Sequence, residues 1–99
     1  MITHIVCWKY KPGTTDDQRA GHIAALRALP SLIPDIESFL VGADVLHLDR
    51  SFDTGLVAVY RDLETLDAYI VHPEHQKVVA IGREIAQQVV SVDFEGAGQ

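Results

Sequence analysis

The stretch Tyr69-Ile70-Val71-His72-Pro73-Glu74-His75 decides how the second half of this chain folds. Proline has no N–H and disfavours helical geometry in the residue before it, so Pro73 ends one helix and opens the next. His75 then falls in the first turn of the following helix. The sequence therefore predicts a short helix that ends near Val71 and a second helix over residues 74–88.

Apolar spacing on both sides of this break turns an imidazole and a phenol inward. Small and apolar residues follow His75 at helical intervals, namely Val78, Val79, Gly82, Ile85, Ala86 and Val89. Tyr69 continues the stripe of Leu63 and Leu66 on the preceding helix. His75 and Tyr69 are therefore predicted to face one apolar interior, where Gly82 is expected to leave room for a ligand.

The first half of the chain carries one strand signal and one helix signal. Residues 2–10 alternate in polarity and predict a strand, one face of which holds Ile2, His4, Val6 and Trp8. Thr15 and Gln18 fit a capping box that opens a helix over residues 16–29. Its predicted inward stripe is His22, Ile23, Leu26 and Leu29. Pro30 and Pro34 are expected to bracket a turn.

Three further strands are predicted, at 36–43, 55–60 and 89–94, with an exposed loop at 45–53 and a frayed tail at 95–99. The order is strand, helix, strand, strand, helix, strand. It predicts an α+β fold of the ferredoxin-like βαββαβ type, with a four-stranded antiparallel sheet and helices on one face. No repeat or linker divides the chain, so residues 1–99 are predicted to form a single domain.

The strands at 55–60 and 89–92 are apolar on both faces, as is expected where both faces are covered. The helices cover one face only. The simplest cover for the other is the sheet of a second copy, which predicts a homodimer through the sheet face. The alternative is that these strands are merely over-hydrophobic and the protein associates weakly.

Charge and cysteine content exclude several classes of partner. The net charge is −6, and the chain has no basic cluster beyond Lys9 and Lys11, so nucleic acid is not expected as a partner. Cys7 is the only cysteine and forms no internal disulfide. No targeting signal or membrane-length apolar run is present, which predicts the cytoplasm and no membrane partner.

Several motifs resemble the stress-responsive α/β-barrel (Dabb) family of the dimeric α+β barrel superfamily. They are Thr3-His4-Ile5-Val6 with Lys9 and Lys11, Gly42-Ala43-Asp44, and above all Ala68-Tyr69 with His72-Pro73-Glu74-His75. The resemblance covers nearly the whole chain and implies the same fold and dimer.

The plant polyketide cyclase branch of that family uses a histidine and a tyrosine for a cofactor-free aldol condensation. The resemblance places these roles at His75 and Tyr69. It also implies a substrate pocket at His4, Val6, Trp8, His22, Leu26, Val78 and Val79. A pocket histidine of the third strand is replaced here by Thr54, and the branch's aromatic pocket walls become His22, Leu26 and Ala86.

The residues themselves support such chemistry. A cyclase needs a base for the proton beside a carbonyl and a donor for the enolate oxygen. At a helix start on an apolar stripe, His75 is expected to stay neutral and able to accept a proton. Alternatively, His75 only caps a carbonyl left open by Pro73, and Tyr69 only packs in the core. His72 is expected to be structural, at the N-cap.

No metal is expected, because no His-x-x-x-His or Cys-x-x-Cys pair exists, and no nucleotide-binding glycine loop is present. Haem, with His75 as its axial ligand, is the variant to check, but no cofactor is predicted. The leading interpretation is a homodimer that binds a small apolar carbonyl or enol compound, with cyclase-like proton transfer. A cofactor-independent monooxygenase and a non-enzymatic stress-related protein are the alternatives.

Overall fold

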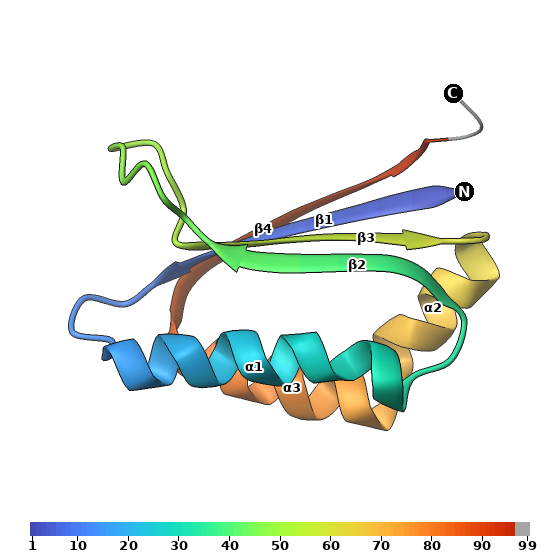
Figure 1. Cartoon of the computed structure of the whole chain (residues 1–99), viewed down its shortest axis with the longest axis horizontal. Helices are drawn as coiled ribbons and strands as arrows, with labels where there is room; N and C mark the ends of the chain where they lie inside the picture. Colours follow the sequence, from blue (N-terminus) through green and yellow to red (C-terminus); the bar gives the residue numbers. More distant parts are fainter. Residues whose placement is uncertain (97–99) are drawn as a thin grey trace.

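The computed structural model describes residues 1–96 and has the order β1 (Ile2–Tyr10), α1 (Asp16–Leu32), β2 (Ile36–Ala43), β3 (Thr54–Tyr60), α2 (Leu63–Val71), α3 (Pro73–Ile85) and β4 (Ala86–Glu95). The strands form one antiparallel sheet in the order β2-β3-β1-β4. Helices α1 and α3 lie along one face of it, and α2 lies at one end (Figure 1). The predicted ferredoxin-like fold is confirmed.

The alternating pattern of β1 determines the inner face of the sheet. Ile2, Val6 and Tyr10 are buried beneath the helices, together with His4 and Trp8, while the residues between them face the other way. Because paired residues share a face, β3 contributes Leu56, Ala58 and Tyr60 to the same layer. Leu26, Leu29 and Leu66 complete this core from the helices.

The helix break falls where Pro73 predicts it. His72 is the N-cap of α3, and its Nδ1 accepts a hydrogen bond of 3.1 Å from the N–H of Glu74. The N-cap position expected for His72 is therefore confirmed. Thr15 likewise forms the predicted capping box with Gln18 at the start of α1.

Two helix ends differ from the prediction. Helix α1 continues through Pro30 to Leu32, because buried Ile33 anchors the last turn and donates its N–H to the Leu29 carbonyl. Helix α3 ends at Ile85 and not at residue 88. The strand-favouring valines of 86–95 pair with β1 from Ala86 onward and take this segment into the sheet.

The chain's last described residues are held by the sheet. Glu95 pairs with Ile2 as the end of β4, and the N–H of Gly96 donates to the Met1 carbonyl at 3.0 Å. The fraying expected from residue 95 onward is thus wrong for Glu95 and Gly96. Residues 97–99 lie outside the described part.

The outer face of the sheet carries exposed apolar side chains from three strands. No helix of residues 1–96 covers this face (Figure 1). Its exposed members are Leu40, Val57, Val90, Val92 and Phe94. They form a continuous apolar surface that one chain leaves open to water.

Candidate functional site

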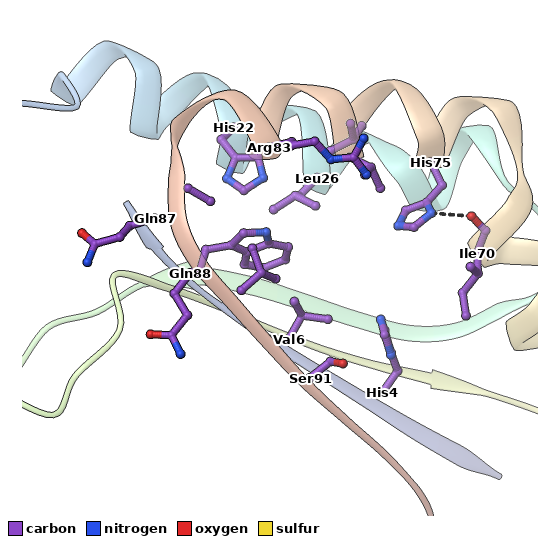
Figure 2. A pocket seen from close by; sticks show the side chains of 15 residues that line it. His4, Val6, His22, Leu26, Ile70, His75, Arg83, Gln87, Gln88 and Ser91 are labelled. Atoms are coloured by element: carbon purple, nitrogen blue, oxygen red, sulfur yellow. Dashed lines mark hydrogen bonds between the residues drawn. The ribbon is translucent and has the colours of Figure 1, made fainter. Parts of the chain in front are cut away.

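A cavity of about 490 Å³ lies between the helix layer and the inner face of β1 and β4 (Figure 2). Its volume falls within the range of small-molecule sites. Most of the wall is apolar, and one side opens to solvent. Of the residues proposed from sequence, those that line it are His4, Val6, Trp8, His22, Leu26, His75, Val78 and Val79.

Two proposed residues do not line this cavity. Tyr69 is 2% exposed, and its ring packs on the His75 imidazole with the ring centroids 4.3 Å apart. Burial raises the pKa of Tyr69 to about 12. Gly82 is also absent from the wall, because the edge of the His22 ring takes the space beside it. A Cβ at position 82 would lie 2.9 Å from His22 Nε2.

The His75 imidazole enters the cavity from the first turn of α3. One of its nitrogens, Nδ1, lies 2.8 Å from the carbonyl oxygen of Ile70, and because a carbonyl only accepts, Nδ1 carries the hydrogen. Burial lowers the pKa of His75, although the Ile70 carbonyl opposes this shift. The neutral ring therefore keeps a lone pair on Nε2, on the edge turned toward the cavity (Figure 2).

Pro73 is the reason this carbonyl accepts side chains. The amide of Glu74, which would bond Ile70 in an unbroken helix, instead donates to His72. The Ile70 carbonyl accepts from His75 and, at 2.7 Å, from the amide of Gln76. The helix break thus fixes the orientation of the His75 ring. The capping role considered for His75 is present, and it leaves Nε2 free.

His22 lies on the opposite helix, near the other end of the cavity (Figure 2). Its Nδ1 is 2.7 Å from the hydroxyl of Tyr10, which is 2.8 Å from the hydroxyl of Thr54. The ring meets the Trp8 indole edge-on, with centroids 5.0 Å apart. His22 is 1% exposed, and burial lowers its pKa.

His4 forms the sheet side of the cavity, facing the His75 end (Figure 2). It pairs with Asp93 across β1 and β4, and its Nδ1 is hydrogen-bonded to the Asp93 carboxylate. This bond orients the ring toward the space between sheet and α3.

Sequence reasoning missed one wall of the cavity and its only cationic group. Ala86, proposed as an aromatic-wall replacement, lies on the wall, but from the strand β4. The lining residues that the sequence does not predict are Ile70, Arg83, Gln87, Gln88 and Ser91. Val89 also lines the cavity, although the sequence places it in a helical stripe. Because the sequence predicts a helix up to residue 88, it does not predict the part of the wall that β4 forms. Arg83 had a usable signal, since it follows His75 by eight residues and Val79 by four on the same face of α3.

Arg83 is the residue of the cavity wall that carries a full positive charge at neutral pH. None of the acidic residues lines the cavity, although the chain has 14 of them against eight Lys and Arg. Figure 2 shows the Arg83 side chain extending from α3 along the cavity toward His75. The site therefore suits a neutral ligand or one with negative charge.

Neither a metal cluster nor a membrane span is found in the described residues. No group of three or more His, Cys, Asp or Glu within 1–96 is arranged to hold a metal ion. No helix in that range is long and apolar enough to cross a membrane.

Comparison with known proteins places the chain in a family. The pattern of the Stress responsive A/B Barrel Domain family, Dabb, matches residues 2–96. The chain belongs to this family. An uncharacterized protein of Streptomyces coelicolor is 32% identical over 98 residues, covering 96% of this chain and 99% of that protein. Olivetolic acid cyclase of Cannabis sativa is 24% identical over 95 residues, covering 94% of each.

Solved structures agree with the fold. A dimeric ferredoxin-like protein of unknown function from Thermobifida fusca has a TM-score of 0.86 and 31% identity, over 94% of this chain and 88% of that one. Hydroxynitrile lyase from Passiflora edulis has a TM-score of 0.83 and 18% identity, over 94% and 90%. A putative antibiotic biosynthesis monooxygenase from Chloroflexus aurantiacus has a TM-score of 0.73 and 22% identity, over 100% and 96%. The last two comparisons show the fold alone.

Proposed function

We propose that this Dabb protein binds a small apolar carbonyl or enol compound in the cavity and transfers a proton at the carbon beside the carbonyl without a cofactor. One observation carries the proposal. His75 donates Nδ1–H to the Ile70 carbonyl, which leaves Nε2 as an unprotonated base on the cavity side of the ring. The lowered pKa of His75 keeps that base neutral at pH 7.

The reaction step follows from this arrangement. Nε2 of His75 takes the proton, and the electrons of the C–H bond form the C=C bond of an enolate whose charge rests on oxygen. The apolar wall of Val6, Leu26 and Val78 holds the carbon skeleton. Returning the proton gives exchange, whereas attack of the enolate carbon on a second carbonyl of the same molecule gives a cyclase. The similarity to olivetolic acid cyclase supports the second outcome.

Tyr69 has a different role in this proposal from the donor role that the sequence predicts. Its ring packs on His75 at 4.3 Å and so positions the imidazole. The prediction that its phenol donates to the enolate stays open to test. A single exchange assay tests the base.

Butyrophenone, a neutral phenyl ketone, is incubated in D₂O, and loss of its α-protons is followed by NMR. We expect wild type to accelerate this exchange and His75→Gln to lose on the order of 10²- to 10⁴-fold. His47→Gln is the matched control, because His47 lies in the loop between β2 and β3 with its side chain 79% exposed. Equal rates for wild type and His75→Gln would contradict the proposal.

The two alternative functions give different results in related assays. A cofactor-independent monooxygenase would use the same base to deprotonate a phenol, and oxygen uptake with an electron-rich phenol would then exceed any ketone exchange. A non-enzymatic protein would show neither, and His75→Gln would differ from wild type only in stability. The predicted cytoplasmic location is tested separately by imaging a tagged chain.

We further propose a homodimer through the outer sheet face. The Thermobifida fusca neighbour is described as dimeric, and the exposed Leu40, Val57, Val92 and Phe94 lie on this face. Buried against a second copy, such an apolar surface stabilises association. Sedimentation is expected to give twice the chain mass of 10.9 kDa, and Val57→Lys is expected to give the monomer. A wild-type monomer at micromolar concentration would contradict this.

A further inference from the structure

The end of the cavity opposite His75 contains two ring nitrogens without a protein partner. Nε2 of His22 and Nε1 of Trp8 make no hydrogen bond with any residue described, although these side chains are 1% and 9% exposed. Both rings line the cavity. Because neither nitrogen has a protein partner, both are available to a ligand in the cavity.

Both nitrogens lie close to Gly82 of α3. A point at the Cβ position of residue 82 lies 2.9 Å from His22 Nε2 and 3.5 Å from Trp8 Nε1. Glycine at this position lets both rings approach α3. The two polar edges thus lie close together at one end of a cavity whose wall is mostly apolar, and Trp8 Nε1 always carries a hydrogen.

A chain of hydroxyl groups determines which nitrogen of His22 carries its hydrogen. The Thr54 hydroxyl is buried, and its one partner within residues 1–96 is the Tyr10 hydroxyl at 2.8 Å. Thr54 therefore donates to Tyr10, since otherwise its proton would have no acceptor. Tyr10 in turn donates its own proton to Nδ1 of His22 at 2.7 Å. Burial raises the pKa of Tyr10, so this proton is retained at pH 7.

A neutral His22 that accepts at Nδ1 carries its hydrogen on Nε2. We infer that His22 Nε2–H and Trp8 Nε1–H form a donor pair that holds the oxygen of a bound carbonyl compound while His75 acts on the adjacent carbon. The inference rests on the proposed function and adds the group that stabilises the enolate. It assigns to His22 and Trp8 the donor role that the sequence predicts for Tyr69.

The pair has the properties of an oxyanion site. Both donors are neutral and belong to rings that are held in place, so they need little reorganisation when charge develops on the oxygen. His22 is fixed by Tyr10 on one side and by Gly82 on the other. The ligand class follows from this: a ketone, enol or carboxylate oxygen at the end of an apolar group.

The test uses the Trp8 indole N–H, which gives a single unambiguous NMR signal because the chain has one tryptophan. Butyrophenone is expected to move this proton signal downfield as a hydrogen bond forms. Butylbenzene has the same shape without the carbonyl and is the matched ligand control. Equal shifts with both probes, or none with butyrophenone, would overturn the inference.

Three variants test the effect on the reaction. His22→Leu and His22→Gln both remove the acceptor of Tyr10, but only glutamine returns an N–H near the position of Nε2. We expect His22→Leu to lower the exchange rate at least tenfold, His22→Gln to recover part of it, and Trp8→Phe to lower it several-fold. The carbonyl signal of ¹³C-labelled butyrophenone, bound to each variant, reports whether the hydrogen bond is lost.

The failures of the two proposals are distinguishable. If His75 is not a base, the Trp8 signal still responds to the carbonyl while no exchange is catalysed. If the donor pair is wrong, exchange persists in His22→Leu and the bound ¹³C signal is the same as with wild type. If the ¹³C signal of bound butyrophenone equals its signal in water, only water is hydrogen-bonded to the carbonyl. That result would also overturn the donor pair.

Discussion

His75 and His22 lie on opposite helices at two ends of one cavity, and burial lowers the pKa of both. Their partners differ. His75 donates Nδ1–H to a backbone carbonyl, so its Nε2 is an acceptor, whereas His22 accepts at Nδ1 from Tyr10, so its Nε2 is a donor. The hydrogen-bond partner of Nδ1 therefore determines whether Nε2 of a cavity histidine accepts a proton or donates one, and the residue type alone does not.

The pH dependence of exchange gives the largest expected effect on this comparison. Burial lowers the pKa of both rings from the ordinary value of a histidine, so both rings are neutral at pH 7. As the pH falls through the pKa of His75, Nε2 becomes protonated and the base is lost. The exchange rate is expected to fall about tenfold per pH unit below that pKa and to be flat from pH 7 to 8.

A rate that still rises steeply from pH 7 to 8 would show that His75 is charged at neutral pH.

The lowered pKa values of His75 and His22 also have a consequence for stability. Because the unfolded chain binds protons at these histidines more tightly than the folded chain, the free energy of unfolding is expected to fall as the pH drops from 7 toward 5. Urea titrations at several pH values measure this.

Gly82→Ala tests the His22 side alone. The new methyl group would lie 2.9 Å from His22 Nε2, and the bond to Tyr10 keeps that ring from moving away. We expect about a tenfold loss of exchange and a loss of about 1–3 kcal/mol in the free energy of unfolding. Gly21→Ala is the matched control, because Gly21 also lies in a helix and its Cβ would meet nothing within 4 Å.

Gly21→Ala is expected to raise the free energy of unfolding by up to about 1 kcal/mol and leave exchange unchanged. If both alanine variants behave alike, the close approach of His22 to α3 has no functional role.

Arg83 adds a charge to the comparison, since neither histidine carries one at pH 7. It is exposed, and an ion pair there is worth roughly 0.2–1 kcal/mol. We expect 4-oxo-4-phenylbutanoate to bind up to about fivefold more tightly than butyrophenone, and Arg83→Gln to abolish the difference. Calorimetry with the two probes measures it. An unchanged preference in the variant would exclude Arg83 from ligand selection.

Tyr69→Phe is expected to have the smallest effect. If the Tyr69 ring only positions His75, phenylalanine keeps the contact and the exchange rate stays within about twofold of wild type. Tyr69→Leu removes the ring and is expected to lower the rate more. A tenfold loss in Tyr69→Phe would instead support the phenol donor that the sequence predicts.

The sequence predicts the fold well because local signals are strong. Pro73 marks the helix break, and the alternation of residues 2–10 marks the inner face of β1. The end of α3 at Ile85 was harder, because Ala86, Gln87 and Gln88 fit a helix locally and pairing with β1 overrides that preference.

The site is less predictable because its roles depend on contacts between distant residues. His22, Tyr10 and Thr54 come from α1, β1 and β3, and only the fold shows that their hydroxyls and ring meet. The apolar stripe of α2 correctly predicts that Tyr69 faces the core. It does not determine whether the Tyr69 hydroxyl reaches the cavity. The sequence does predict that His75 faces the interior, because the signals are local. Pro73 and the Ile70 carbonyl lie within five residues of His75.

The most direct test of the account is a long-range ¹H–¹⁵N spectrum of the imidazole rings at pH 7. The account predicts opposite tautomers, with the hydrogen on Nδ1 in His75 and on Nε2 in His22. Finding the same tautomer in both rings, or a doubly protonated His75, would contradict it.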